Sequence, residues 1–318
     1  MNYLLSGSFA YDTILLHKGH FHTRILPESI SRLNVSFGID QSKQEFGGTA
    51  GNIAYNASLL HSSVLLCSSV GKDFERYGLH LEENNIPYNS LTHFNNLHTA
   101  HSWILTDQSN NQITGFHKGA MDYTPTIPKE AYSLPIWHLA PDLSETTAYL
   151  AKTAIKNKIK YFLDPGQSLP SFLEGDSEHI IPFESIVFNS AGMFVNEYES
   201  QLLQDKFKKP LKDFFQGNIE FIVETLGSKG LILHTRNNEV LIPIAKTNII
   251  CDPTGCGDAF RAGFLYGYIN KMDLKSCSEL GAVMGSFAIE CFGGQNHKPT
   301  IKEISARLFN NFEWQLNK

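Results

Sequence analysis

The segment Asp252-Pro253-Thr254-Gly255-Cys256-Gly257-Asp258-Ala259-Phe260 says most about the fold and chemistry of this chain. A proline-stiffened turn leads into two glycines separated by one residue, and an apolar-periodic helix follows directly. Gly255 and Gly257 can adopt backbone angles that other residues rarely reach, so successive N–H groups can point into one concavity. The N-terminal end of the helix adds about half an elementary positive charge there. The segment therefore predicts a receptacle for a highly charged anion, such as a transferring phosphoryl group.

Asp258 stands beside this predicted receptacle. An anion would repel a carboxylate, so a carboxylate at this place indicates proton abstraction from a substrate hydroxyl. The alternative is that Asp258 only caps a helix after a glycine turn. The segment by itself is compatible with both interpretations.

Composition excludes several classes of partner. The chain has 318 residues, of which 42% are hydrophobic and 18% charged, as in ordinary globular proteins. Its formal net charge is −6, and no run of Lys or Arg exceeds two residues, so we expect no nucleic-acid partner. No segment approaches the roughly 18 apolar residues needed to span a bilayer, so we expect no membrane partner.

Cysteine usage and the first residues bear on location. The five cysteines form no CxxC pair and are odd in number, which predicts reduced structural thiols and a cytoplasmic protein. The segment 1–7 has no charged region before its short apolar run, so it predicts a first strand and not a signal peptide.

Short apolar runs alternate with helical patterns along the chain. The expected strands are Tyr3–Gly7, Val64–Val70, Ile136–Leu139, Tyr161–Asp164, Ile186–Asn189, Phe221–Glu224 and Leu231–His234. The expected helices are Ala50–Leu60, Phe74–Asn84, Glu145–Asn157, Asn196–Leu203, Asp258–Asn270, Ser276–Cys291 and Ile301–Phe312. Strands interleaved with helices favour a mostly parallel sheet covered on both faces. We therefore expect an α/β fold and a single domain over residues 1–318.

Two stretches interrupt this alternation. Residues 13–46 hold no long helix, and residues 97–117 carry alternating, strand-like runs. Both suit a small β-structure that projects from the main sheet. Because no long linker separates them from the rest, we expect an insertion within one domain.

Two segments near the N-terminus are candidate ligand contacts. Phe46-Gly47-Gly48-Thr49-Ala50-Gly51-Asn52 precedes a helix, and its small residues would let a ligand approach the backbone while Asn52 donates and accepts hydrogen bonds. Asp12 follows the first strand, where a carboxylate can bind two vicinal hydroxyls. The structural alternatives are a tightly packed helix start for the first and a turn aspartate for the second.

Two further segments point to a nucleotide. Asn196 and Glu199 open a helix with an amide and a carboxylate on one face, oxygen groups that suit Mg²⁺ held partly through water. Thr225-Leu226-Gly227-Ser228-Lys229-Gly230 follows a strand and offers hydroxyls, glycines and one lysine to phosphates. The alternatives are an ordinary capping pair and a hairpin turn.

Several common nucleotide-binding motifs are missing from the sequence. It contains no G-x-x-x-x-G-K-[ST], no H-R-D or D-F-G set, and no complete G-x-G-x-x-G at the first helix. These absences disfavour P-loop NTPases, protein kinases and NAD-binding oxidoreductases of the Rossmann type.

Taken together and in this order, the candidate segments resemble the ribokinase-like, or PfkB, family of carbohydrate and nucleoside kinases. The resemblance covers nearly the whole chain. Residues 47–52 match the family's first signature, and residues 252–260 match its second, the highly specific D-[TP]-[TX]-G-[AX]-G-D pattern. Residues 196–199 are similar to its N-x-x-E element, and residues 225–230 to its T-x-G-x-x-G phosphate segment. Four matches in the family's order favour function over the structural alternatives.

Within this family the chain looks most like adenosine kinases of the actinobacterial type. The segments that carry this likeness are Gly7-Ser8-x-Ala10-x-Asp12, Leu26-Pro27-Glu28 with Val35-Ser36-Phe37, Gly48-x-Ala50-Gly51-Asn52, His98-Thr99-Ala100, Phe116-x-x-Gly119-Ala120-Met121, Asp164-Pro165-x-Gln167 and Asp252–Leu265. The resemblance implies a three-layer α/β/α core with a nine-stranded type of sheet and a β-lid from the two irregular stretches. It also implies a transferase that phosphorylates the 5′-hydroxyl of adenosine with ATP, giving AMP in purine salvage.

The resemblance assigns roles to matching positions. The resemblance assigns proton abstraction to Asp258. It assigns stabilisation of the phosphoryl group to the backbone N–H groups of Gly255, Cys256 and Gly257. The nucleoside falls to Ser8, Asp12, Ser36, Gly48, Asn52, Phe116 and Gln167. The expected ATP-binding residues are Asn196, Thr225, Gly227, Gly230, Gly255 and Gly257, and residues 292–296 would lie beside the base of ATP. Asn196 and Glu199 would hold Mg²⁺ through water, K⁺ would lie near Asp252 and Gly293, and the lid would join a homodimer.

Two positions depart from these adenosine kinases. Ser102 stands where an aromatic side chain would stack on adenine, although Trp103 would replace it if the strand register shifted. Ser168 follows Gln167 where a second glutamine is usual. Both departures concern the base, so inosine, guanosine or a sugar such as ribose remain alternative substrates. A nucleoside-binding regulator without catalysis is a further alternative, and an unrelated doubly wound oxidoreductase is the last.

Overall fold

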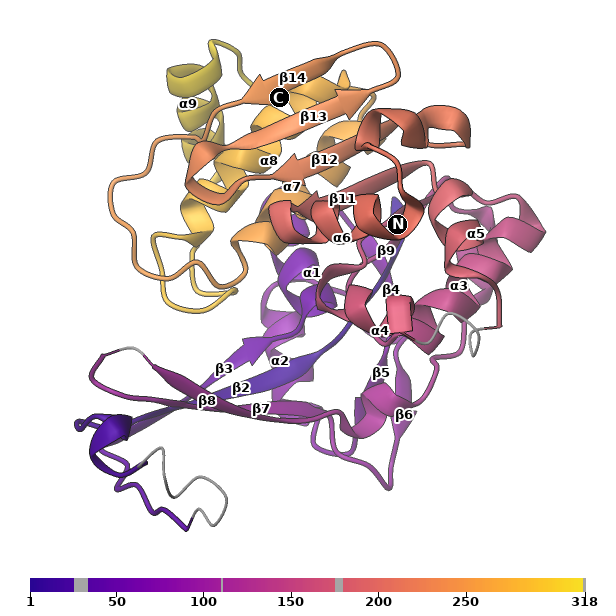
Figure 1. The fold of residues 1–318 in the computed structure, drawn as a ribbon. Helices are drawn as coiled ribbons and strands as arrows, with labels where there is room; N and C mark the ends of the chain where they lie inside the picture. Colours follow the sequence, from indigo (N-terminus) through magenta and orange to yellow (C-terminus); the bar gives the residue numbers. More distant parts are fainter. Residues whose placement is uncertain (26–33, 110, 175–179, 317–318) are drawn as a thin grey trace.

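A sheet of eight strands forms the centre of the computed structural model, which describes residues 1–25, 34–109, 111–174 and 180–316. The strand order is β14-β13-β12-β11-β10-β9-β1-β4 (Figure 1). All pairs from β4 to β12 are parallel, and β13 and β14 form an antiparallel extension. The strands are β1 (Tyr3–Ser6), β4 (Val64–Cys67), β9 (Trp137–Leu139), β10 (Tyr161–Leu163), β11 (Gly192–Asn196), β12 (Phe221–Thr225), β13 (Leu231–Thr235) and β14 (Glu239–Ile242).

Helices cover both faces of this sheet because its central strands are apolar on both sides. Two buried clusters result, one on each face. The first face carries α1 (Thr49–Leu59), α2 (Glu75–Glu83), α7 (Cys256–Ile269) and α8 (Leu274–Ala288), with α9 (Ile301–Phe312) packed on α8. The second carries α3 (Ser144–Asn157), α4 (Leu169–Glu174), α5 (Phe183–Phe188) and α6 (Glu197–Phe207). The expected three-layer α/β/α architecture with a mostly parallel sheet is confirmed.

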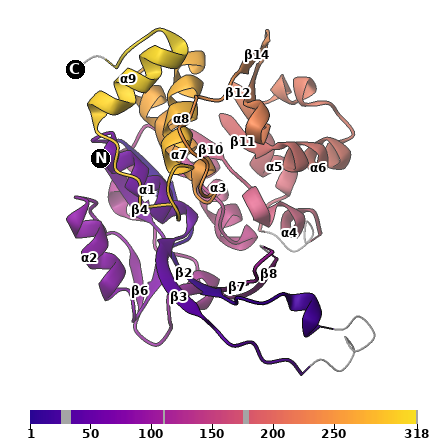
Figure 2. The ribbon, with the colours of Figure 1, turned by 90° about the vertical axis from the view of Figure 1, so that its left-hand side faces the viewer.

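A second sheet projects from this body (Figures 1 and 2). Its order is β3-β2-β7-β8, and its strands are β2 (Ala10–Leu16), β3 (Gln41–Gly47), β7 (Ala100–Thr106) and β8 (Gln112–His117). A short parallel pair, β5 (Ser69–Gly71) and β6 (Thr92–Phe94), continues from the end of β4. The four strands lie largely within the stretches 13–46 and 97–117. Residues 26–33, which include the segment Leu26-Pro27-Glu28, are outside the described residues, and the function of this sheet as a lid stays a prediction.

Short 3-10 helices fill several connections. They are η1 (Phe21–Thr23), η3 (Gly119–Asp122), η4 (Lys129–Ser133), η5 (Gly166–Ser168), η6 (Leu211–Gln216) and η7 (Gly227–Lys229). The turns η5 and η7 follow β10 and β12, so they lie at the carboxyl edge of the parallel strands, where ligands of such folds bind.

Three sequence expectations were wrong in detail. The segment Ile186–Asn189 is not a strand: residues 186–188 end helix α5, and the strand is β11. The run Val64–Val70 is divided into β4 and β5, because the chain leaves the main sheet after Cys67. The main sheet has eight strands over the described ranges, not the nine that the family resemblance implied.

Two further observations concern the helices and the cysteines. No helix in the described ranges is both long and apolar enough to cross a membrane. All five cysteines lie in described residues and are free thiols, as the odd count predicted.

Candidate active site

Of the two glycines before Asp258, only Gly255 has the backbone conformation that the sequence predicted, because Gly257 lies inside helix α7 and has no positive φ. Gly255 is the N-cap residue, with φ +76° and ψ −1° in the left-handed region. A Cβ at this position would lie 2.6 Å from Cα of Gly294, so the turn packs directly on the backbone of a second glycine pair. The helix begins at Cys256, whose N–H donates to the carbonyl of Pro253 at 3.2 Å, so this N–H is not free for a ligand in the way that the sequence predicted. The pKa of the Cys256 thiol is raised to about 12, chiefly by burial, so it contributes no thiolate charge.

Asp258 lies in the first turn of α7 and is half-buried. Its carboxylate Oδ2 accepts a hydrogen bond of 2.8 Å from Nδ2 of Asn52, a buried residue of α1. The two predicted site segments are thus brought together, although 206 residues separate them. Asn52 can reach Asp258 because its helix, α1, packs against α7.

The surroundings of Asp258 bring the pKa of its carboxyl group close to neutral pH. Its pKa is raised to about 7, mainly because burial disfavours the charged carboxylate. The hydrogen bond from Asn52 and the charge of Arg261 oppose this rise, whereas Asp164 adds to it. A carboxylate with this pKa can accept a proton from a hydroxyl and release it near neutral pH.

Arg261 and Asp164 form a buried ion pair behind Asp258. Nε of Arg261 donates to Oδ2 of Asp164 at 2.7 Å, and Asp164 directly follows β10. Arg261 lies three residues after Asp258, hence on the same face of α7. The pair therefore places one positive and one negative charge close to the candidate base, with opposite effects on its pKa.

The start of α1 joins the first strand to the second sheet. Gly48 is the N-cap residue with φ +86°, and a Cβ there would lie 2.7 Å from the amide nitrogen of Ala10. Ser8 packs at the same place, because its Oγ accepts from the backbone N–H of Thr49 at 3.1 Å. Ser8 and Gly48 are therefore neighbours, as expected for one binding site.

Asp12 belongs to a row of side chains across the second sheet. The strand registers place Glu45, Asp12, Ser102 and Phe116 opposite one another on β3, β2, β7 and β8. Residues directly opposite on neighbouring strands share a face. The pKa of Asp12 is raised to about 6, first by burial and then by the charge of Glu45, against a hydrogen bond from Ser102. Asp12 and Phe116, both predicted nucleoside contacts, thus point to the same side of the sheet.

The register also excludes the predicted substitution of Trp103 for Ser102. Trp103 pairs with Thr13 and Gly115, so it lies on the opposite face from Asp12. There it stacks on His101 with ring centroids 4.2 Å apart. The condition for this replacement, a shifted register, is not met, because the strand keeps regular alternation at this point.

Ser36 and Gln167 are less closely associated with the other predicted contacts. Ser36 is exposed and precedes Phe37, whose ring packs on His17 and Phe21 at the far end of β2. Since His17 is five residues beyond Asp12, this end lies about 17 Å along the strand. Gln167 is exposed in η5, at the carboxyl edge of the main sheet.

Asn196 and Glu199 form the cap of α6. Oδ1 of Asn196 accepts from the backbone N–H of Glu199 at 2.8 Å, and the carboxylate of Glu199 accepts from the N–H and the side-chain amide of Asn196, each at 2.9 Å. This is the capping pair considered as the structural alternative. Every side-chain oxygen of the pair already accepts one hydrogen bond, so direct coordination of a metal by these atoms would compete with the cap.

The segment 225–230 lies next to Asn196 at the same sheet edge. Thr225 pairs with Asn196 at the ends of the parallel strands β12 and β11. Gly227 begins η7 with φ +56°, and nothing lies within 4 Å of the place where its Cβ would be. Gly230 closes the turn against the carbonyl of Ile242. The predicted ATP-binding residues of β11 and β12 are therefore adjacent, with open space at Gly227.

The structure shows contacts of three residues in this region that the sequence did not predict. Gln295 donates from Nε2 to Oδ1 of Asn52 at 2.9 Å, and Asn296 donates to Oε2 of Glu45 at 2.8 Å. Arg261 was part of a matching segment but had no assigned role. Gln295 and Asn296 belong to the segment 292–296 that was expected beside the base of ATP, but their contacts with Asn52 and Glu45 were not expected.

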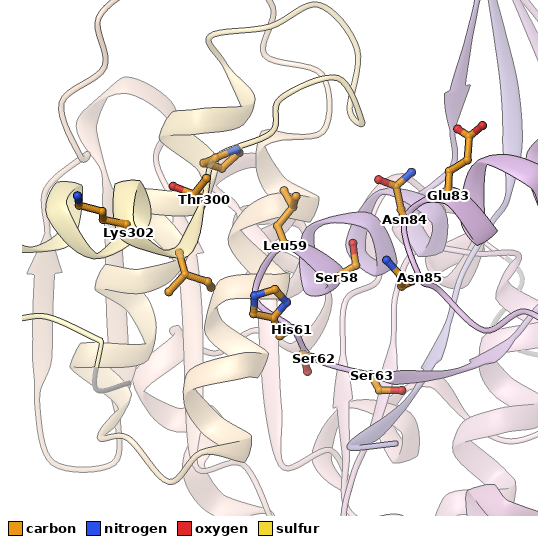
Figure 3. Close-up of a pocket in the computed structure, with 12 residues that line it drawn as sticks. Ser58, Leu59, His61, Ser62, Ser63, Glu83, Asn84, Asn85, Thr300 and Lys302 are labelled. Carbon is orange, nitrogen blue, oxygen red and sulfur yellow. The ribbon is translucent and has the colours of Figure 1, made fainter.

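A pocket of about 650 Å³ lies elsewhere, between the ends of α1 and α2 and the start of α9 (Figure 3). Leu59, Asn84 and Thr300 are among the residues that line it. It includes none of the predicted site residues, so the Asp258 region remains the candidate active site.

Comparisons with known proteins identify the family of this chain. A model of the pfkB family of carbohydrate kinases matches residues 23–301. A nucleoside kinase of Methanocaldococcus jannaschii is 31% identical over 283 residues, which are 88% of this chain and 91% of that protein. The nucleoside kinase of Burkholderia thailandensis, solved in complex with inosine, is 28% identical and covers 98% of this chain and 99% of its own, with a TM-score of 0.82. A second structure of it, in complex with ADP-inosine, is 29% identical with a TM-score of 0.79, covering 98% and 97%.

These matches extend over both sheets. The architecture is the ribokinase-like fold that the sequence predicted. The matched range also contains the Gly48, Asn196, Thr225 and Asp258 segments. The chain therefore belongs to the pfkB family of carbohydrate kinases, which transfer a phosphoryl group to a hydroxyl acceptor.

Proposed function

We propose that this chain is an ATP-dependent nucleoside kinase that phosphorylates the 5′-hydroxyl of a purine nucleoside. The observation that carries the proposal is the position of Asp258. Its carboxylate has a pKa raised to about 7 and lies one helical turn or less from the Gly255 turn and the N-terminal end of α7. A base and an anion receptacle in one place are what phosphoryl transfer to an alcohol requires.

In the proposed reaction, Asp258 accepts the proton of the 5′-hydroxyl as its oxygen attacks the γ-phosphorus of ATP. The bond from that phosphorus to the ADP oxygen breaks, so AMP or IMP and ADP leave. The backbone N–H groups of Gly255 and Gly257 would stabilise the charge on the transferring group. The N–H of Cys256, which was also expected to do so, already donates to Pro253. Asn52, which holds Asp258 at 2.8 Å, supports this role by fixing the carboxylate.

The sugar would bind between the second sheet and the start of α1. Asp12 can accept hydrogen bonds from two vicinal hydroxyls, and Gly48 lets the sugar approach the backbone. Ser8, Asn52 and Phe116 would complete this side, and the sheet would close as a lid to exclude water. Ser36 and Gln167 would join the site only on closure.

ATP would lie along the edge formed by Asn196, Thr225, Gly227 and Gly230, with residues 292–296 beside its base. Asn196 and Glu199 fit Mg²⁺ only through water, because their oxygens already serve the α6 cap. When bound, Mg²⁺ would neutralise charge on the ATP phosphates. K⁺ would lie near Asp252, whose Oδ2 accepts from the N–H of Gly293 at 2.9 Å.

Two nucleosides have support as the acceptor. Adenosine is favoured by the sequence resemblance to adenosine kinases. Inosine is favoured by the likeness to a kinase that was solved with inosine. Ser102 faces the Asp12 side of the sheet and leaves more room there than an aromatic residue would. We propose both purine nucleosides, with a place in purine salvage, a cytoplasmic location and a lid-mediated homodimer as further expectations.

A substrate panel tests the proposal. The purified chain with MgATP should phosphorylate adenosine or inosine with a kcat/KM at least ~100-fold above that for ribose, because the base adds binding energy that a free sugar lacks. ADP release in a coupled assay, with product identified by mass spectrometry, measures this. Ribose as the best acceptor would replace the proposal by a sugar kinase, and binding of nucleoside without turnover would favour a non-catalytic regulator.

Replacing Asp12 by alanine should mainly raise KM for the nucleoside. Loss of two hydrogen bonds to a charged group predicts an increase of about 10²-fold or more, with kcat little changed. Steady-state kinetics measure both constants. Glu45→Gln is the matched control, because it removes the neighbouring carboxylate charge on the same face and should leave KM nearly unchanged. An unaltered KM in Asp12→Ala would remove Asp12 from the sugar site.

A further inference from the structure

A buried chain of hydrogen bonds runs from α2 to the candidate base. Nε2 of His80 lies 3.0 Å from Oε1 of Gln295, whose Nε2 donates to Oδ1 of Asn52 at 2.9 Å. Nδ2 of Asn52 then donates to Oδ2 of Asp258 at 2.8 Å. Gln295 is 3% exposed and Asn52 5%, so water does not replace these partners. Gln295 belongs to the segment 292–296 proposed to lie beside the base of ATP, but its side chain is buried and its amide bonds His80, Asn52 and Tyr77.

The hydroxyl group of Tyr77 fixes the direction of the hydrogen bonds in this chain of side chains. Tyr77 donates its phenol hydrogen to the carbonyl of Gly47 at 2.8 Å, so its oxygen can only accept from Gln295. Nε2 of Gln295 makes that second bond at 2.7 Å. The amide of Gln295 must therefore present its NH₂ group to Tyr77 and Asn52, and its oxygen to the Nε2–H of His80.

The direction of these hydrogen bonds decides which end of the Asn52 side chain contacts the carboxylate of Asp258. With Oδ1 held by Gln295, the NH₂ group of Asn52 must face the carboxylate. A reversed Asn52 would place its oxygen against Asp258 and two NH₂ groups against each other, and both contacts are unfavourable. Gly294 confines the amide from a third side, since a Cβ there would lie 2.6 Å from Oδ1 of Asn52.

We propose that Gln295 is a positioning residue for phosphoryl transfer, which acts through Asn52 to keep a hydrogen-bond donor on the carboxylate of Asp258. The inference rests on the proposed function of Asp258 as the base and adds a residue 243 positions away from Asn52 in sequence.

Other charged or titratable groups also act on Asp258. They are Arg261 and Cys256 on α7, Asp164 after β10 and Tyr77 on α2. In the described part of the chain, Asn52 is nevertheless the one side chain that hydrogen-bonds the carboxylate. A reversed or mobile Asn52 would leave Asp258 with a higher proton affinity, because a bond to its ionised form would be lost.

The test is the pH profile of kcat/KM for Gln295→Met, which keeps the length of the side chain but removes both polar ends. The acid limb should move up by about one pH unit, equivalent to about a tenfold loss of activity below the limb and recovery above it. A loss through misfolding or weaker substrate binding would be equal at every pH. A profile that superimposes on the wild type would overturn the inference.

Two further variants make the test decisive. Asn56→Leu is the matched control: Asn56 is a buried amide one turn along α1 that bonds the backbone of Asn52 and the ring of His297, and its loss should lower the melting temperature but leave the limb in place. His80→Phe keeps the ring that stacks on Phe46 but removes the donor to Gln295, and should shift the limb in the same direction by less. If Gln295→Met does not fold, His80→Phe decides: an acid limb of kcat/KM at the wild-type pH would refute the proposed role of these hydrogen bonds.

The result separates this inference from the proposed function. An active wild type with an unshifted Gln295→Met profile refutes only the role of Gln295. A wild type that phosphorylates no acceptor refutes both.

Discussion

Asp258→Asn is expected to lower kcat by about 10²- to 10⁴-fold, with little change in nucleoside affinity. Asparagine keeps the shape of the side chain and can still meet the amide of Asn52, but it cannot accept the substrate proton. Single-turnover kinetics measure the chemical step, and calorimetry measures nucleoside binding. A variant that retains most of its turnover would show that Asp258 only caps α7.

The pH dependence of the wild type should report the same group. Asp258 must be ionised to act as a base, and its pKa is raised to about 7, so activity should be lost as the pH falls through about 7. The acid limb of kcat/KM belongs to the free enzyme, which is the state described here. A limb near pH 4 would mean that burial does not govern this carboxylate.

Thermal stability provides an internal control for the same variant. A raised pKa means that the folded protein binds the proton of Asp258 more tightly than the unfolded chain does. At pH above 7 the ionised carboxylate therefore costs folding free energy, and Asp258→Asn should melt no lower than the wild type. A lower activity at equal or higher melting temperature separates catalysis from folding.

Local patterns predicted those parts of the site that lie within one segment. The glycine turn and Asp258 are specified by nine consecutive residues, and the structure gives Gly255 the left-handed conformation expected of it. The alternation of strands and helices likewise predicted the layered α/β core. Such features depend on neighbours in sequence, so a single sequence carries enough information for them.

The misassigned strand shows where this information ends. Ile186, Val187 and Phe188 form an apolar run with two β-branched residues, and such a run also suits one buried helical turn. Periodicity cannot distinguish the two over so few residues. The strand that follows, β11, is buried on both faces over residues 192–195 and shows no alternation.

Contacts between distant segments were beyond sequence reasoning. The bond from Gln295 to Asn52 and the face on which Trp103 lies depend on how α1, the 293–296 turn and the second sheet meet. Neither follows from spacing. The residues that tune Asp258 therefore come from several elements, and only the structure identifies them.

Gly255→Ala is expected to lower kcat by about 10²-fold, because displacement of a catalytic group by about 1 Å can cost that much. The added Cβ would lie 2.6 Å from Cα of Gly294, a backbone atom that cannot move aside alone. Gly294 in turn touches Asn52, so the strain reaches the group that holds Asp258. Left-handed backbone adds about 1–2 kcal/mol of cost for alanine, and overpacking adds a further ~1–3 kcal/mol.

Gly227→Ala separates these two costs in a comparison of melting temperatures. Gly227 also has a positive φ, +56°, but nothing lies within 4 Å of its Cβ position, so alanine there incurs only the conformational cost. Gly255→Ala should therefore melt well below Gly227→Ala, and its kcat should fall because the strain displaces Asn52 and the carboxylate that it holds. Equal melting temperatures for the two variants, with normal turnover in Gly255→Ala, would mean that the turn yields without displacing the base. The receptacle would then not depend on contact between the two glycine segments.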